Sequence, residues 1–583
     1  MIKKVFRQML ITQIVSAMTV MICMLIDSIM IGRFLGVDAM SAYGLATPVL
    51  LIFAAFGSML SAGIQVMCGK TMGSGDMEAT NGCFSVSVFL AAAVSFVGLL
   101  AVLLFTSPIC TMLGAGSPTP DNTVFFLTRD YIRGFIIGAP AFIFAQIMVP
   151  YMQISGSRKR LVAAVIAMTL GDVLLDILNV FVIKGGTLGM GLASSFSYYI
   201  VFFIGAAYFL KKKCIFKFRT ALIKLKRCIE LIKYGIPTVI NQISLVLLVF
   251  VLNKILLEVG QTVAVAAYSV ISTVGNICYC FGSGVAAVAL LLSSMFYSDE
   301  EKSALRNLVK TMTFYAVVLD VAVTVIVLFT APLLVGLFLD NPAAEDISVI
   351  GLRLFSLSLL PCSLNTTFKN YYQGVNKTGF TQAISVMQNF AFTAFFAFIL
   401  SRFIAATGVW LAYVCGETLT FFVITAVVWI NYKRASFSAD AYSFLPNDFG
   451  AHGDDYIEMT VNTKEGAVEA SVNAGEFCKR HGESERNCKL ISLCVEEMTN
   501  NIVEHGFTAD KQDHSIDVRL LFKNEKRIIR IRDNCVDFDP TKYIELHKSD
   551  DPAAHIGIRM VMKMVKSANY VNSLGLNNLT LEL

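Results

Sequence analysis

The sequence predicts an all-α membrane protein of twelve transmembrane helices in two six-helix repeats, followed by a soluble α/β domain. Apolar residues make up 56% of the 583 residues, charged residues only 15%, and mean hydropathy is +0.66. Soluble domains carry about 25% charged residues, so lipid is expected to surround most of this chain. Long apolar runs continue to about Asn431, and shorter helix and strand patterns occupy residues 456–583.

Twelve segments of the chain are long and apolar enough to cross a bilayer, which takes about 20 residues. We expect their ends to be accurate to within a few residues. They lie near 8–32, 44–68, 84–106, 131–153, 161–183, 187–210, 232–258, 265–292, 311–338, 350–371, 381–400 and 407–431.

Basic residues predict the orientation of these segments. With twelve crossings, the clusters before the first segment, after the fourth, after the sixth and after the twelfth all fall on one side. Because Lys and Arg accumulate on the cytosolic side of membrane proteins, we expect both termini and the soluble domain to be cytosolic. The clusters are Lys3, Lys4 and Arg7; 158–160; 211–227; and Lys433 and Arg434.

The membrane part repeats itself at an offset of roughly 220–230 residues. Phe105–Pro108 recurs as Phe329–Pro332, and Tyr151–Gln153 recurs as Tyr371–Gln373. Transporters place binding sites at the interface of such repeats and work by rocking one repeat against the other, so a carrier is favoured. A channel or a scaffold could also be duplicated. The expected domains are two membrane lobes, 1–220 and 221–435, a linker, 436–455, and the soluble domain, 456–583.

Two stretches of the first repeat are similar to a known family. The run Asp27–Tyr43 and the segment Gly63–Phe84, with its loop Gly73–Asp76, resemble the multidrug and toxic compound extrusion (MATE) carriers. The similarity covers about residues 5–435. It implies a secondary antiporter that expels organic, often cationic, compounds in exchange for Na⁺ or H⁺.

Acidic residues inside the apolar segments are candidates for the coupling site. An ionisable group costs about 2.5–3.5 kcal/mol or more within the hydrocarbon, so it is a functional candidate by default. Asp27 lies in the first segment, Asp172 and Asp176 share one face of the fifth, and Ser194 and Ser197 lie at comparable depth in the sixth. Carboxylates with hydroxyls suit Na⁺, and paired carboxylates suit H⁺. The resemblance implies that Asp27 and Asp176 match acids of the family; pairing with a lysine or capping of a broken helix is the alternative.

Three further acids lie in the second repeat. They are weaker candidates, because Glu258 falls near a helix end and polar packing would explain Asp320 and Glu417.

The soluble domain reads as an α/β sandwich in which helices cover one face of a mixed sheet. Residues 432–455 lack periodicity and precede a strand at Tyr456–Val461. The remaining expected elements are helices near 464–481 and 486–506, strands near 515–522 and 527–533, a helix near 556–567, and strands near 568–573 and 578–583.

Four residues of this domain could bind a nucleotide. Glu497 and Asn501 lie one turn apart on one helix face, where a carboxylate can orient water and an amide oxygen can bind Mg²⁺. Asp533 ends a strand and could accept a hydrogen bond from adenine. Gly557 begins a helix whose N–H groups could meet phosphate. Each feature alone also fits a solvated, capping or turn residue.

The order of these features resembles the GHKL ATPase fold, particularly the anti-sigma-factor serine kinases. The resemblance implies that Glu497 is the general base, Asn501 the Mg²⁺ ligand, Asp533 the adenine contact and Gly557 part of the phosphate-binding stretch. A G-x-x-x-x-G-K-[ST] loop is absent from the sequence, so direct ATP-driven pumping is not expected.

Two functions follow as expectations. The first is an Na⁺- or H⁺-coupled exporter of small organic compounds in the cytoplasmic membrane, with a cytosolic domain that binds ATP and Mg²⁺ and regulates or signals. The second is a membrane receptor whose domain is a serine kinase that acts on a soluble antagonist protein. An enzymatic activity of the domain would be weak ATPase or protein serine kinase activity. Both act among lipids, and neither binds nucleic acid.

Overall fold

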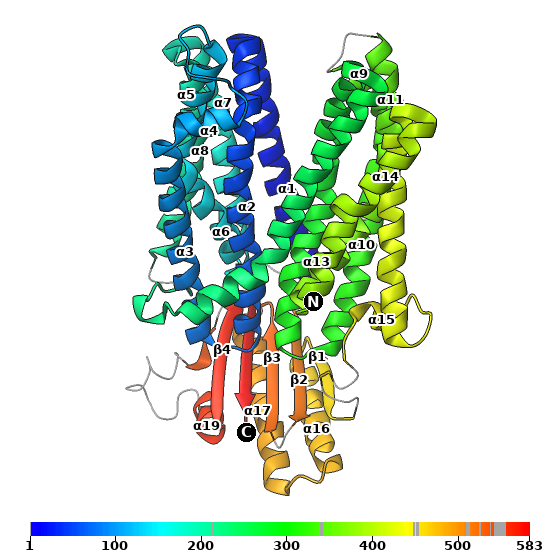
Figure 1. Ribbon diagram of the computed structural model, residues 1–583. Helices are drawn as coiled ribbons and strands as arrows, with labels where there is room; N and C mark the ends of the chain where they lie inside the picture. Colours follow the sequence, from blue (N-terminus) through cyan, green and yellow to red (C-terminus); the bar gives the residue numbers. More distant parts are fainter. Residues whose placement is uncertain are drawn as a thin grey trace.

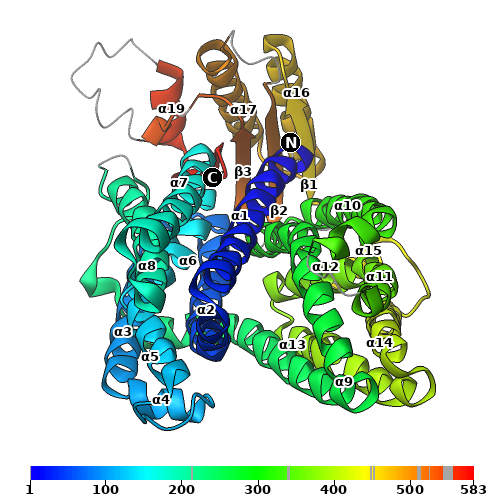
Figure 2. The same cartoon turned by 90° about the horizontal axis from the view of Figure 1, so that it is seen from above.

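The computed structural model describes residues 2–211, 214–337, 342–446, 449–450, 454–508, 514–523, 526–536, 538–541 and 556–583. Two helical lobes stand side by side, and the soluble domain lies at one end of them (Figure 1). Seen at right angles, the two lobes remain separate groups of helices (Figure 2). We call the end that contacts the soluble domain the soluble-domain end.

The N-terminal lobe consists of helices α1 to α8. Two of its long helices continue into short π-helices, η1 and η2. The bounds are α1 Ile2–Met30, η1 Ile31–Leu35, α2 Val37–Gly73, α3 Met77–Leu104, α4 Thr106–Met112, α5 Thr123–Ile136, α6 Ala139–Ile154, α7 Arg158–Ile177, η2 Leu178–Ile183 and α8 Gly186–Phe209.

The C-terminal lobe follows the 3₁₀ turn η3, Thr220–Leu222. It also contains a π-helix, η4, within one of its long helices. The bounds are α9 Leu225–Ser298, α10 Lys302–Gly336, α11 Pro342–Ser356, α12 Leu359–Gly374, α13 Thr378–Val386, η4 Met387–Ala391, α14 Phe392–Tyr432 and α15 Ala439–Ser443. The short helix α15 lies within the stretch that the sequence predicted to be a linker.

The described helices agree with twelve crossings. Nine are long and apolar enough to span a membrane, or up to eleven if each of two bent pairs is one span. The longest span, Thr378–Tyr432, is non-helical at Ile404 and Ala405. A Cβ on Gly416 would lie 2.9 Å from the backbone nitrogen of Thr393, so the chain folds back at that break. The span Thr378–Tyr432 therefore crosses the membrane twice, and the number of crossings rises from eleven to the predicted twelve.

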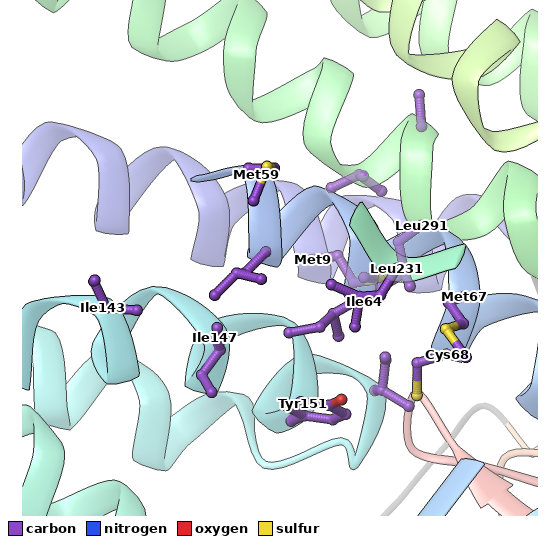
Figure 3. Close-up of a cluster of buried hydrophobic side chains, with 14 of the residues drawn as sticks. Met9, Met59, Ile64, Met67, Cys68, Ile143, Ile147, Tyr151, Leu231 and Leu291 are labelled. Atoms are coloured by element: carbon purple, nitrogen blue, oxygen red, sulfur yellow. The ribbon is translucent and has the colours of Figure 1, made fainter. Parts of the chain in front are cut away.

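The two lobes touch through α2 and α9 near the soluble-domain end. A Cβ on Gly63 would lie 2.4 Å from the carbonyl oxygen of Leu231, which shows how closely the backbones approach. The hydroxyl of Ser294 also donates to the backbone carbonyl oxygen of Gln65 at 2.8 Å. In the close-up of this core, Ile64 of α2 lies beside Leu231 of α9 (Figure 3). Small residues here allow a tight seam between the lobes.

The soluble domain is a five-stranded sheet with helices on one face. Its strand order is β1-β2-β3-β5-β4, and every described pair is antiparallel. The prediction of a mixed sheet was therefore wrong: β2–β3 and β4–β5 are hairpins, and the helical pair α16–α17 returns the chain antiparallel to β1. The bounds are β1 Tyr456–Val461, α16 Lys464–Arg480, α17 Glu485–Gly506, β2 Ile516–Lys523, β3 Lys526–Asp533, α19 Ile556–Met564, β4 Ser567–Ser573 and β5 Leu576–Glu582.

The sheet has one apolar and one polar face because side chains alternate along each strand. Val518, Ile529 and Ile531 pack with the helices in the core of the domain. The alternate residues include Arg530 and Arg532, which reach the soluble-domain end of the lobes. The sheet, rather than its helices, therefore meets the membrane part.

Candidate functional site

Three buried acids lie together in the N-terminal lobe. Asp27 is 8% exposed, Asp172 4% and Asp176 0%. The carboxyl of Asp27, on α1, faces those of both Asp172 and Asp176, which stand one turn apart on α7. Helix α1 packs directly against α7. The structure thus brings the three sequence-predicted acids into one cluster.

The backbone departs from regular α-helix just after the acids. The π-helix η1 begins four residues after Asp27, and η2 begins two residues after Asp176. In η2, the buried Asn179 accepts a hydrogen bond from Gly185 N at 3.1 Å and donates to Gly186 O at 3.1 Å. Such π-helical turns are frequent at functional sites, and the sequence analysis did not anticipate them.

The acids have no fixed positive partner among the described residues. No ion pair between a Lys, Arg or His and Asp27, Asp172 or Asp176 occurs there. One oxygen each of Asp27 and Asp172, and both of Asp176, lack a hydrogen-bond partner in the described part of the chain. Unpartnered carboxylates in a membrane segment are costly unless a cation or proton neutralises them.

The serines of α8 differ in their positions. Ser197 lies beside Asp172, as does the thiol of Cys23 on α1. Ser194 is buried, but its hydroxyl donates within its own helix, to Met190 O at 3.4 Å. The structure therefore joins Ser197 to the acid cluster, whereas the hydrogen bond of Ser194 in the described part of the chain stays within α8.

A second buried polar cluster lies in the C-terminal lobe. Glu417 of α14 accepts a hydrogen bond from Asn365 at 2.8 Å and one from Gln388 at 3.5 Å. Gln388, in η4, also accepts from the ammonium of Lys369 at 3.1 Å, and Asn241 accepts from the same ammonium at 2.6 Å. The sequence analysis missed Lys369. The signal that could have revealed it is that Lys369 is the one charged residue of the sequence 354–371.

In the soluble domain, helix α17 carries two of the predicted nucleotide contacts. The Asn501 side chain donates to the carbonyl of Glu497 at 2.6 Å, which leaves the amide oxygen to act as a ligand. Gly557 packs directly on Glu497: a Cβ at Gly557 would lie 1.8 Å from Glu497 Oε2. The start of α19 therefore lies against the middle of α17. His555, before this glycine, lies outside the described residues.

Asp533 lies at the end of β3 and is 4% exposed. Its Oδ1 accepts hydrogen bonds from Cys535 N at 2.9 Å and from Asn577 Nδ2 at 2.8 Å. The segment after β3 reaches the end of α17, where Val536 N donates to Gly506 O at 3.4 Å. Asp533 is thus held rigidly on the sheet near the C-terminal end of the helix that carries Asn501.

The donor set fits Mg²⁺ held mostly through phosphate and water. Among the described residues, no three His, Cys, Asp or Glu side chains are placed to bind a metal ion. Mg²⁺ is often bound by one or two protein oxygens together with substrate phosphates, and Asn501 could supply one such oxygen. When bound, ATP with Mg²⁺ would supply a phosphoryl group for transfer.

The polar face of the sheet docks on the connection between α9 and α10. Asp299 and Glu301 of that connection are 8% and 6% exposed. Arg532 lies 3.2 Å from Glu301 and 3.4 Å from Asp299, and Arg530 lies 3.4 Å from Asp299. Arg519 lies 3.8 Å from Glu301. We call these five residues the docking cluster.

The two acids of the docking cluster differ in their pKa values. Burial raises the pKa of Asp299 to about 7, more than Arg530 and Arg532 lower it, and the negative Glu301 adds to the rise. At Glu301 burial also opposes ionisation, but the three arginines outweigh it and lower the pKa. Glu301 is therefore the anion of the cluster, and Asp299 titrates near neutral pH.

The soluble domain also contacts the N-terminal lobe. Leu574 N donates to Ile154 O at 2.6 Å, and Arg158 donates to Leu574 O at 2.5 Å. Asn569 of β4 donates to the carbonyl of Gly75, between α2 and α3. One rigid sheet therefore touches both lobes at the soluble-domain end.

Comparison with known proteins identifies the membrane part. The MatE family model matches residues 13–178 and 237–399, more than half of the chain. The chain belongs to the MatE family. The two matched stretches fall one in each lobe, so they divide where the structure does.

Relatives and solved structures support the MATE assignment. The multidrug export protein MepA of Staphylococcus saprophyticus is 22% identical over 405 residues, which cover 69% of this chain and 88% of that protein. MepA of a bovine Staphylococcus aureus strain is 22% identical over 397 residues, 68% of this chain and 86% of that protein. A MATE transporter structure from Vibrio cholerae has a TM-score of 0.68 at 16% identity, covering 76% of this chain and 98% of that one.

The soluble part of this MATE protein matches a second family. Residues 460–583 match the histidine kinase-like ATPase domain. This confirms the predicted fusion of a MATE membrane part with a GHKL-type domain, and it implies that the domain binds ATP. The protein is therefore a multi-pass membrane protein with a nucleotide-binding module docked on both lobes.

Proposed function

We propose that this MATE protein is an antiporter that exports small organic compounds in exchange for Na⁺ or H⁺, and that both its termini are cytosolic. The observation that carries the proposal is the cluster of Asp27, Asp172 and Asp176, buried together without a positive partner among the described residues. Export also agrees with the names of the relatives, which are multidrug export proteins.

The acid cluster could couple ion entry to export because its charge has two alternative states. Three carboxylates held near one another repel when all are ionised, so the empty cluster attracts a cation or a proton. Once neutralised, the cluster no longer opposes closer packing of α1 and α7. Cys23 and Ser197 would add neutral ligands beside Asp172. Either ion fits this donor set.

The ATP-binding domain would regulate the carrier by holding the two lobes together. Alternating access requires the lobes to separate at one end and then at the other. A domain hydrogen-bonded to Ile154 of one lobe and paired with Glu301 of the other opposes separation at the soluble-domain end. A cavity of about 1020 Å³ lies between the sheet and the lobes, so the interface is incompletely packed. Such an interface suits reversible release.

Transport by the full chain in vesicles tests both parts of this proposal. An inward Na⁺ gradient or an inward proton gradient is imposed separately, with and without ATP on the side of the soluble domain. We expect one gradient to drive export and ATP to change its rate. Export that is indifferent to both gradients would contradict the coupling, and export that is indifferent to ATP would contradict the regulation.

A second candidate is a receptor whose domain phosphorylates a protein. The contact of Gly557 with Glu497, one turn from Asn501, favours it, because this arrangement could support phosphoryl transfer as well as binding. The full chain is incubated with γ-labelled ATP and cell extract. Label on a serine of a soluble protein would support the receptor, and its absence alongside ion-driven export would support the carrier alone.

A further inference from the structure

A polar pocket lies between the two lobes. It has a volume of about 250 Å³ and is lined from α2 and α6 of one lobe and from α9, α12 and α13 of the other. Pockets for drug-sized ligands are about 300–1,000 Å³, so this one suits a smaller molecule. Its amide and charged lining residues are Gln65, Gln146, Asn241, Lys369, Asn370 and Gln373.

The charge of the pocket comes from Lys369. The lining includes this one cation and no acid among the described residues. Lys369 is 5% exposed, and its ammonium donates to two amide oxygens, those of Asn241 and Gln388. An ammonium has three donors, so one remains for a further acceptor. Glu417 lies behind Gln388 and is hydrogen-bonded to Asn365, so its carboxylate does not line the pocket.

The neutral groups of the lining also suit a hydrogen-bonding ligand. The Oε1 of Gln65 is buried, and within the described part of the chain it has no hydrogen-bond partner. Buried polar atoms normally have partners, so this oxygen in the pocket wall is suited to accept a hydrogen bond from a ligand. The hydroxyls of Ser58, Ser61 and Thr238 lie in the same wall. These polar groups are better suited to bind a hydroxylated molecule than an apolar one.

We propose that this pocket binds a small hydroxylated anion, bearing a carboxylate or a phosphate, as the exported compound. The inference rests on the proposed export function and names its substrate class. Lys369 would pair with the anionic group, and the amides and hydroxyls would bind the rest. A cationic compound, which the family resemblance implies, would meet a buried positive charge here. Because both lobes supply lining residues, the anion would lose part of its site when the lobes separate.

Equilibrium binding to the full chain in phosphatidylcholine nanodiscs tests the proposal without any gradient. The probes are gluconate, glucose 6-phosphate, neutral glucose and cationic glucosamine. We expect at least one anion to bind more tightly than glucose and glucosamine. Lys369→Gln should weaken that binding by roughly 10- to 100-fold, since a charge-assisted hydrogen bond is lost. Lys369→Arg should retain most of it, and Lys233→Gln, which removes an exposed lysine of α9, should leave it unchanged.

Several results would overturn the proposal. These are glucosamine binding as tightly as either anion, failure of both anions to bind, or equal anion binding by wild type and Lys369→Gln. If Lys369→Gln fails to fold, the comparison of probes on wild type and Lys369→Arg decides. Loss of the anion binding when phosphatidylglycerol is added would assign the pocket to a lipid headgroup instead. The Asp27→Asn variant should still bind the anion, so a failure of ion coupling is distinguishable from a failure of this proposal.

Discussion

Replacing Glu301 with Gln tests how the ATPase domain is held. Glu301 lies 3.2 Å from Arg532 and 3.8 Å from Arg519, and it is nearly fully buried. Gln keeps the size and one acceptor oxygen but loses the charge that compensates these arginines. Truncating one partner of a buried, hydrogen-bonded charge pair costs about 2–5 kcal/mol. Because the Arg532 side chain is 21% exposed, we take the lower limit, about 2 kcal/mol, or roughly 30-fold in docking.

Hydrogen–deuterium exchange of the full chain in nanodiscs measures this change. Exchange of amides protected by docking follows the opening equilibrium. Leu574 N donates to Ile154 O across the interface, so the peptide that covers Leu574 should exchange roughly 30-fold faster in Glu301→Gln. The control is Glu485→Gln, which breaks an exposed pair with Lys489, 2.7 Å away. Exposed pairs contribute little, so this variant should leave docking unchanged. Equal exchange in the two variants would show that the docking cluster does not hold the domain.

Three further predictions concern the docking cluster and the ATP site. The docked Asp299 has a pKa of about 7, above the ordinary 3.8, so docking takes up a proton. Docking should therefore strengthen as pH falls from about 8 to 6. Asp299→Asn should abolish that pH dependence in the same exchange measurement. Asn501→Ala should weaken Mg²⁺-dependent ATP binding about 10-fold or more, by titration with a fluorescent ATP analogue, whereas unchanged affinity would remove the ligand assignment. Gly557→Ala should displace the Glu497 carboxylate and lower ATP turnover more than ATP binding; turnover equal to wild type would contradict the tight contact.

The lengths of the apolar segments predicted the membrane crossings well, because each crossing depends on a local sequence of about 20 residues. The predicted segments 381–400 and 407–431 lie on either side of the break at Ile404 and Ala405. The π-helices η1, η2 and η4 were not predicted, since a shift of one hydrogen bond leaves the apolar pattern intact.

Contacts between distant segments account for most of what the sequence could not predict. Asp27 and Asp176 stood out because isolated acids in apolar runs are rare, and the structure places them together. Lys369 went unnoticed, since its partners Asn241 and Gln388 come from other helices. The alternation in β3 predicts that Arg530 and Arg532 lie on the same face of the sheet. No local sequence pattern predicts that this face docks on the lobes. The sequence also failed to predict that the sheet is antiparallel, because this depends on which strands pair.

The most direct test of the account compares ion-driven export by wild type and by Asp27→Asn. Both proteins are reconstituted in vesicles, and the accumulation of one exported compound is followed under the gradient that drives wild type. The control is Asp38→Asn, which changes an exposed acid at the start of α2. We predict that Asp27→Asn loses at least about 10-fold of gradient-driven accumulation but retains exchange of compound across the membrane, while Asp38→Asn matches wild type. Full gradient-driven accumulation by Asp27→Asn would contradict the claim that this buried acid cluster couples ion entry to export.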